Sequence, residues 1–339
     1  SATTGTATIK IQGTDTYLNT ANTDDSTLTS DEIQVYINGI LDGDTNNNGT
    51  IDAGETPTIT PTISAVTPLT ETRNVFGSDP VTTETVQYGV EYTITINGWV
   101  QNANQVKLKI LEDAIKDESG NGNKETELIV YNVLKTTSGE TGESSAFLGE
   151  TTISRKDIQQ VIFENSIDGA TASGVKKVWD VSAQQDGSIK AWTSQTSAPY
   201  TVYIGSDSEI FANQNSSYLF SYIGYGANCT STTTLSNLNL LNTNSTINMS
   251  YMFRDFGYNA MTSLDLGTFN TSNVTTMKEM FNSCGYMAMT SFDLGDNFDT
   301  SKVTDMSVMF KNLGYKKMTS LDLGDKFDTS SVTNMSHMF

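Results

Sequence analysis

The stretch "MTSFDLGDNFDTSKVTDMSVMF" occupies residues 289–310, and residues 318–339 read "MTSLDLGDKFDTSSVTNMSHMF". The two stretches begin 29 residues apart and agree at most positions. An earlier copy begins with "MTSLDLG" at residue 261, and a more diverged copy contains "SNLNLLN" and "STINMSYMF". Self-similarity at a fixed period of this length is typical of a chain that folds as a stack of repeats.

The dipeptide Met-Phe ends each copy and sets the repeat length. It occurs at 252–253, 280–281, 309–310 and 338–339, so the spacings are 28, 29 and 29 residues. One repeat cannot bury its own apolar face, whereas stacked neighbours can. The sequence therefore predicts repeats with a period of 28–29 residues over 219–339. Because the last copy stops at Phe339 without a capping repeat, we expect further repeats or a partner to cover that end.

Each copy contains two local patterns. In "SLDLG", Leu264 and Leu266 alternate with Asp265, which predicts a strand with the leucines inward and the aspartate outward. In "Met-x-x-Met-Phe", Met277, Met280 and Phe281 are spaced as on one face of a helical turn, and a polar residue precedes them as an N-cap. We therefore expect one strand and one short helical turn per coil, with the methionines filling the core.

The repeat as a whole resembles that of the BspA-like leucine-rich-repeat bacterial surface proteins, over residues 219–339. The stretch "VWDVSAQQDGSIKAW" (178–192) also resembles the segment that leads into such repeats, which extends the likeness back to about residue 150. The resemblance implies display on the bacterial cell surface, adhesion to host or community proteins, and no enzymatic activity. The "GYNA" and "GYKK" segments are departures, because family copies often carry a shorter loop there.

The first part of the chain has a different pattern. Short segments such as "TATIKIQ" (6–12), "EYTITINGW" (91–99) and "TELIVYNV" (126–133) alternate apolar and polar residues between turn residues. This pattern is typical of an antiparallel sandwich. Residues 1–134 also resemble, more loosely, bacterial Ig-like stalk domains. We expect a linker at 135–145 and a mixed capping region at 146–218. The predicted fold is therefore mainly β, an Ig-like β-sandwich followed by a leucine-rich-repeat solenoid.

Composition excludes several classes of function. The net charge of −20 argues against binding nucleic-acid phosphates or an anionic membrane surface. The chain has one histidine, His337, and no nucleophile–base constellation, so we expect no enzyme. Its two cysteines, Cys229 and Cys284, are too few for a disulfide framework and lie about two coils apart. We therefore expect both thiols to be free and buried.

One loop in the first part has the pattern of a calcium site. In "DTNNNGTIDAGE" (44–55), oxygen-bearing residues alternate along the loop, and a glycine occupies the position of the sharp turn. The predicted ligands are Asp44, Asn46, Asn48, Thr50 through its carbonyl, Asp52 and Glu55. The flanking segments read as strands rather than helices, so the loop would connect strands. A solvated loop rich in Asn and Gly is the alternative interpretation.

Two outward rows in the repeats are the candidate partner-binding residues. The first row is Asp265, Asp293 and Asp322, and the second is Tyr258, Tyr286 and Tyr315. If coils stack at strand spacing, the three carboxylates lie about 5 Å apart, and a basic partner or bridging cations would relieve their repulsion. The alternative is that the aspartates serve the coil itself, held by hydroxyls such as those of Thr262, Thr290 and Thr319.

These observations favour a non-catalytic, extracellular surface protein, an adhesin that binds proteins on host or neighbouring cells through the repeats. Two alternatives remain open. The chain would pack against copies of itself as a subunit of a surface filament or layer, or it would be the carbohydrate-binding part of a larger secreted enzyme. The three tryptophans, at 99, 179 and 192, are scattered rather than arranged as a sugar-binding platform.

Overall fold

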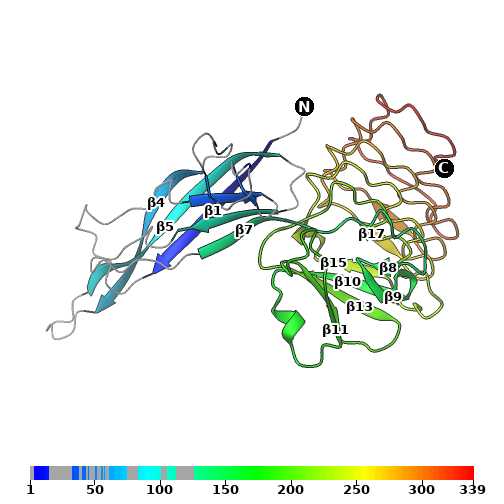
Figure 1. Cartoon of the computed structure of the whole chain (residues 1–339). Helices are drawn as coiled ribbons and strands as arrows, with labels where there is room; N and C mark the ends of the chain where they lie inside the picture. The colour runs from blue at the N-terminus through cyan, green and yellow to red at the C-terminus, as the bar shows by residue number, and fades with distance from the viewer. Residues whose placement is uncertain are drawn as a thin grey trace. The chain divides into compact units, whose positions relative to one another are not determined.

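The computed structural model describes residues 4–14, 33–37, 40–42, 45, 50–51, 55, 57, 61–74, 83–100, 105–111 and 126–339. The chain divides into two compact units, Ser1–Val130 (unit one) and Tyr131–Phe339 (unit two). The fold is mainly β, with several small sheets (Figure 1). The described residues contain no α-helix, and three short 3-10 helices are assigned among them: η2 (Arg155–Asp157), η3 (Asp168–Thr171) and η4 (Leu238–Leu240).

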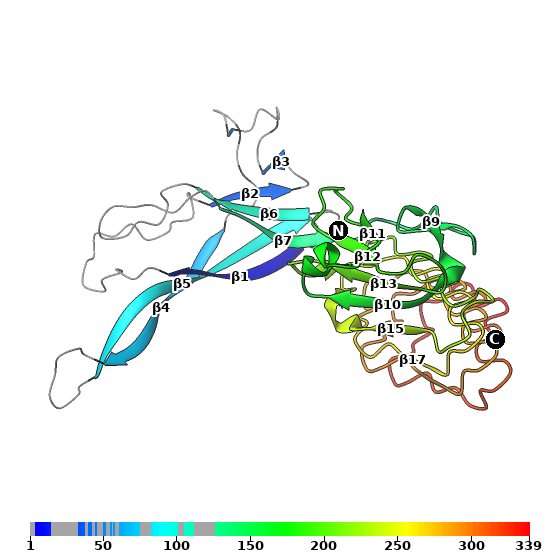
Figure 2. The ribbon, with the colours of Figure 1, turned by 90° about the horizontal axis from the view of Figure 1, so that it is seen from below.

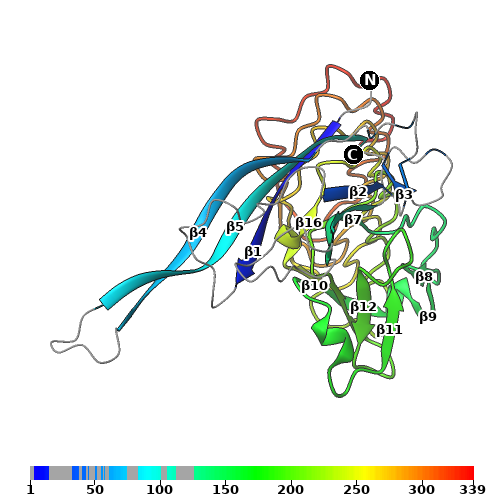
Figure 3. The same ribbon diagram turned by 60° about the vertical axis from the view of Figure 1, so that its left-hand side comes forward.

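Unit one contains two groups of strands. In the first, the long strand β5 (Thr83–Val100) pairs antiparallel with β1 (Thr4–Thr14) and β4 (Thr62–Asn74) (Figure 3). In the second, β6 (Gln105–Ile110) lies between β7 (Thr126–Val133) and β2 (Ile33–Ile37), and β3 (Ile40–Leu41) pairs with β2. The alternation that the sequence shows is reproduced in β6, whose buried residues are Val106, Leu108 and Ile110.

Unit two begins with a mixed sheet of five strands, in the order β11-β12-β13-β10-β15 (Figure 2). Its strands are β10 (Ile158–Glu164), β11 (Lys177–Asp180), β12 (Lys190–Thr193), β13 (Tyr200–Gly205) and β15 (Thr234–Ser236). β10 runs parallel to β13 and β15, and β12 runs antiparallel to its two neighbours. The end of β7 pairs with β14 (Ile210–Phe211), which also pairs with β16 (Leu241–Asn242). A small hairpin joins β8 (Ala146–Phe147) and β9 (Glu150–Ser154).

Residues 135–145, which the sequence suggests as a linker, pack within unit two. The Thr137 hydroxyl donates to the Ser217 carbonyl at 2.8 Å. The Glu140 carboxylate accepts from the Leu148 and Gly149 N–H groups and forms an ion pair with Arg155, whose side chain is fully buried. The Arg155 guanidinium also donates to the carbonyls of 218, 219 and 221. This segment therefore ties the start of unit two to its repeats.

The repeats stack in parallel, one coil on the next (Figure 1). Parallel bridges connect Asn215, Asn248, Thr276, Asp305 and Asn334 in turn. We therefore define coil one as residues 215–247, coil two as 248–275, coil three as 276–304, coil four as 305–333, and the start of a fifth turn as 334–339. The predicted inner strand forms in two coils, as β17 (Ser263–Asp265) and β18 (Ser291–Asp293), which pair in parallel.

The prediction of a helical turn at Met-x-x-Met-Phe is wrong. The Met277, Glu279 and Phe281 N–H groups donate to carbonyls of coil four, and only the intervening Met280 N–H bonds back, to Met277. The result is a chain of tight turns with positive φ at the third position, 53° at Glu279 and 61° at Val308. The expected N-caps act in these turns instead, since Asn248 and Asp305 accept the N–H of the residue two positions on. A helix cannot form here because every second N–H group donates to a carbonyl of the next coil.

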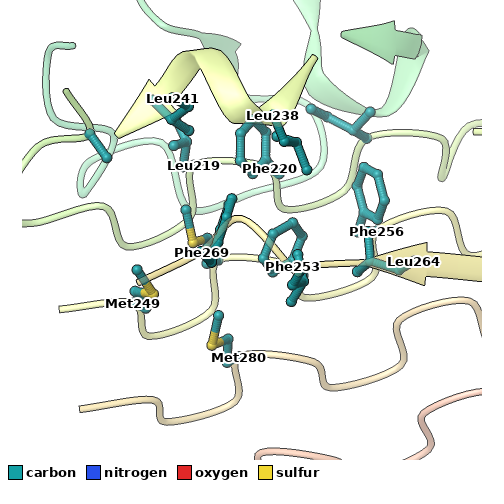
Figure 4. Close-up of a cluster of buried hydrophobic side chains, with 14 of the residues drawn as sticks. Leu219, Phe220, Leu238, Leu241, Met249, Phe253, Phe256, Leu264, Phe269 and Met280 are labelled. Carbon is teal, nitrogen blue, oxygen red and sulfur yellow. The ribbon is translucent and has the colours of Figure 1, made fainter. Parts of the chain in front are cut away.

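The core of the repeats is an aromatic and methionine stack (Figure 4). Phenylalanines of successive coils lie ring against ring, with centroids 5.4–5.7 Å apart. This spine consists of Phe220, Phe253, Phe281, Phe310 and Phe339. Methionines such as Met249, Met277 and Met306 are fully buried beside it, which confirms their predicted packing role.

Candidate functional site

A groove of about 850 Å³ lies along the strand side of coils two to four. Its walls come from β17, β18 and the segment 322–326. The floor is apolar, since Leu264, Phe292 and Phe298 line it. The predicted row Asp265, Asp293 and Asp322 lies in this groove, and all three residues are exposed. Because Asp265 is paired with Asp293, their backbones are about 4.8 Å apart.

Each aspartate of the row also stabilises its own coil. One carboxylate oxygen accepts the N–H of the glycine two residues later, at 2.8–2.9 Å, which closes a turn at Gly267, Gly295 and Gly324. Within unit two, the hydrogen bonds of these carboxylates come from the glycines and not from threonine hydroxyls, and the Thr290 hydroxyl donates instead to the Thr262 carbonyl. One oxygen of each aspartate therefore serves the fold, and the other accepts no hydrogen bond from residues of unit two.

Coils three and four carry additional carboxylates in the groove. Between the turn glycine and the next Phe, coil two has one residue, Thr268, whereas the later coils have two. The added residues place Asp296 and Asp325 in the groove wall, with Lys326 as the single cation there. The longer turns close differently: the Phe298 and Phe327 N–H groups donate to the Gly295 and Gly324 carbonyls, whereas in coil two the Phe269 N–H donates to the Leu266 carbonyl.

The predicted tyrosine row forms a separate ladder. Tyr258 and Tyr286 stack at 4.8 Å with an interplanar angle of 3°, and Tyr286 and Tyr315 stack at 5.2 Å. The Lys316 ammonium lies 4.9 Å from the Tyr315 ring. None of these tyrosines lines the groove. Because the rings cover one another, only the last, Tyr315, is largely exposed, at 61%.

A second aromatic cluster lies on the turn segments of coils one to three, and the sequence did not indicate it. Tyr218 and Tyr251 stack at 4.5 Å, and the Arg254 guanidinium lies 5.8 Å from the Tyr251 ring. Arg254 also forms ion pairs with Asp255 and Glu279, both at 3.3 Å. Burial raises the pKa of Asp255 to about 6, although Arg254 acts in the opposite direction. The sequence signal that could have revealed this cluster is variation between the copies, because the third residue of the turn is Tyr, Glu and Val in successive coils.

Only part of the predicted calcium loop lies within the described residues. Glu55 Oε1 accepts from the Thr45 N–H at 2.8 Å and from its hydroxyl at 2.5 Å. This closes the loop by bringing its second and twelfth positions together. Thr50 is exposed, and Asp44, Asn46, Asn48 and Asp52 lie outside the described residues. Carboxylate, amide and carbonyl oxygens are the donors that a calcium ion takes, so the residue types fit that ion.

Both cysteines are free and buried, as the sequence predicts. Burial raises the pKa of the Cys229 thiol to about 11 and that of Cys284 well above its ordinary value. A thiol that stays protonated is a poor nucleophile and a poor metal ligand. Neither cysteine is therefore a catalytic candidate.

Comparison with known proteins gives one match. Residues 229–316 match the family described as "Mycoplasma protein of unknown function, DUF285", which is about a quarter of the chain. This region runs from the middle of coil one into coil four and includes the first two aspartates of the groove. Searches of curated proteins and of solved structures each found no match. Among the described residues, no helix has both the length and the apolar character needed to cross a membrane.

Proposed function

We propose that this chain belongs to a non-catalytic protein of the bacterial cell surface, an adhesin that binds a protein of host or neighbouring cells through its repeats. The observation that carries the proposal is the groove of coils two to four, which combines an apolar floor with the carboxylates of five aspartates. Protein-binding surfaces commonly combine a buried apolar centre with a charged rim. Stacked repeats also offer a regular surface suited to many small contacts.

The finer assignment follows from the sequence resemblance. We infer that unit two is a BspA-like leucine-rich-repeat solenoid and that unit one is an Ig-like sandwich acting as a stalk. The parallel bridges between coils, which recur every 28 or 29 residues from Asn248 onward, support the solenoid. The antiparallel pairing of β5 with β1 and β4, and of β2 with β6, supports the sandwich. In unit one we also propose a calcium site at the loop of residues 44–55, supported by the closure of that loop through Glu55.

Adhesion of coated beads tests the proposed function. Beads carrying the full chain are applied to host-cell monolayers, and the retained beads are counted with and without prior protease treatment of the cells. We expect retention that protease abolishes. A groove-and-ladder variant, Tyr315→Ser with Asp322→Asn, should lower retention at least severalfold, whereas the matched variant Val178→Ser with Asp168→Asn should not.

Two results would contradict this proposal. Retention that survives protease treatment would show that the ligand is not a protein. Equal retention of the two variants would show that the repeat face is not the binding surface. Sedimentation of the free chain is the companion measurement, because concentration-dependent growth of large assemblies would favour the filament alternative over adhesion.

A further inference from the structure

The hydrogen-bond ladder of the turn segments runs in one direction through the repeats. Alternate N–H groups of each coil donate to alternate carbonyls of the next coil. In coil two, the carbonyls that accept from coil one belong to Asn248, Ser250, Met252 and Arg254. Coil one follows no other coil, so its equivalent carbonyls need donors from elsewhere, because buried backbone groups are nearly always paired.

Side chains supply these donors at every position of the ladder. The bridge between Asn215 and Asn248 sets the register, so the equivalent carbonyls of coil one are those of residues 215, 217, 219 and 221. The Thr136 hydroxyl donates to the first at 3.0 Å, and the Thr137 hydroxyl donates to the second at 2.8 Å. The Arg155 guanidinium donates to the third at 3.1 Å and to the fourth at 3.4 Å. We call Thr136, Thr137 and Arg155 the ladder cap.

Arg155 is held in place for this role. Its side chain is fully buried and forms an ion pair with Glu140, whose carboxylate also accepts the N–H groups of Leu148 and Gly149. The Arg155 Nε–H donates to the Ala146 carbonyl at 3.0 Å. A guanidinium carries several N–H donors in one rigid plane, so a single side chain bonds both this segment and coil one. An apolar side chain would fill the same space but leave the carbonyls of coil one unpaired.

The opposite face of the stack has free ladder donors. The N–H groups of Met335, His337 and Phe339 are equivalent to those with which coil three bonds coil four, and no carbonyl of residues 131–339 accepts them. We call this face the tail and the face of coil one the head. If the head carbonyls were free, the tail donors of one copy would pair with the head of another. Such a head-to-tail contact repeats along the assembly and gives a filament unless it closes into a ring.

We propose that the ladder cap prevents copies of this chain from joining head to tail. The cap occupies the head carbonyls, so the tail N–H groups of a second copy find no acceptor there. Backbone edges with unpaired groups are sites of assembly between chains unless the protein covers them. The inference goes beyond the proposed function and does not rest on it, because it concerns how copies are kept apart and not which ligand the repeats bind.

Sedimentation of the full chain over a range of concentrations tests the cap. The parent should keep one sedimentation coefficient throughout. Arg155→Met removes the donors to two head carbonyls and leaves the Glu140 carboxylate without its cation, which favours release of the capping segment. The average mass of this variant should at least double as its concentration rises. Head-to-tail assembly of the parent, or a variant that is folded by circular dichroism and sediments as the parent does, would overturn the proposal.

A second variant keeps the buried ion pair and decides the matter if Arg155→Met does not fold. Thr136→Val with Thr137→Val preserves the shape of both side chains and removes two ladder donors, so its average mass should also rise with concentration. The matched control is Thr171→Val with Thr193→Val, because the hydroxyls of these threonines bond outside the ladder. Equal sedimentation of the two double variants would overturn the proposal.

The direction of the contact is tested by blocking the tail. Phe339→Glu places a charge at a residue that is 70% exposed and should abolish the association of Arg155→Met. A chain with both changes has an open head and a blocked tail. Mixed with the parent, it should therefore form pairs and nothing larger. Assembly of this chain on its own would show that the association is not head to tail, and the proposal would fail.

Discussion

At the scale of single residues, the turn segments contain residues whose backbone adopts a positive φ, which is rare for residues other than glycine. Val308 has a φ of 61°, and a β-branched residue in this left-handed region is strained by about 1–2 kcal/mol. Val308→Asn should therefore raise the free energy of unfolding by about 1 kcal/mol, because Asn tolerates this conformation. Urea unfolding measures the change. Val178→Asn is the control, on the exposed side of β11, and should give no gain; a gain of similar size there would remove the strain argument.

The Asp255 carboxyl should make the stability of unit two depend on pH. Burial raises its pKa from 3.8 to about 6, and Glu279 and Glu143 add to the shift while Arg254 opposes it. Since the folded state holds the proton more tightly, this contribution is complete below about pH 4 and is lost as the pH rises through about 6. Asp255→Asn removes the titration. Its stability relative to the parent should be higher near pH 7.5 than near pH 4.5, by roughly 1–2 kcal/mol.

Thermal melts of both proteins across this pH range give the comparison. Asp168→Asn, at an exposed carboxylate of η3, is the control and should leave the pH profile unchanged. A pH-independent difference between Asp255→Asn and the parent would mean that the carboxylate stays ionised in the fold.

The candidate residues were partly predictable from the sequence. The alternation in "SLDLG" places Asp265 outward, and the structure agrees. The partner of its carboxylate, the N–H of Gly267, was missed, because hydroxyls of the neighbouring threonines were expected to hold it. The Arg254 cluster was missed for a different reason. Its residues differ from coil to coil, so a search for what the copies share passes over them.

At the scale of elements, the phenylalanine spine should dominate the stability of the repeats. Phe281 is fully buried between Phe253 and Phe310, whereas Phe339 is 70% exposed. Phe281→Ala should lower the free energy of unfolding by about 3–5 kcal/mol, and Phe339→Ala by less than about 1 kcal/mol. Urea unfolding followed by circular dichroism measures both. Similar losses in the two variants would contradict a core centred on coils two to four.

In the turn segments, the sequence predicts the buried residues correctly but the type of secondary structure wrongly. Met277, Met280 and Phe281 are all buried, as the spacing predicts. A run of tight turns buries the same positions as one helical turn, so spacing does not distinguish them. The deciding bonds run to residues 28 positions away, from the Met277 N–H to the Asp305 carbonyl. Such bonds depend on stacking, which local propensity does not encode.

At the scale of the whole molecule, the repeat period was the most informative part of the sequence. It predicted the stacking that the bridges from Asn215 to Asn334 show. Alternation in residues 1–134 predicted strands, but not that β5 would be 18 residues long and pair on both sides. Strand pairing is decided by contacts between distant segments, and a pattern of period two is compatible with many pairings.

Two compact units should unfold in two transitions, and calcium should stabilise only unit one, which contains the loop of residues 44–55. A weak extracellular site has a Kd of about 0.1–1 mM, so 10 mM calcium should add roughly 1.4–2.7 kcal/mol to the stability of unit one. Glu55→Gln should remove this gain, because the bidentate ligand at the last loop position is lost. Glu164→Gln, in unit two, is the matched control and should keep it.

The chain contains its own reporter for assigning the two transitions. Both cysteines are buried in unit two, so thiol labelling during heating follows the unfolding of that unit. We expect labelling to begin at the same temperature with and without calcium, while the other transition, followed by circular dichroism, moves upward by several degrees. Coincident melts with and without calcium would refute the loop as a calcium site. A calcium shift that moves thiol labelling instead would place the ion in unit two and refute its assignment to the loop of residues 44–55.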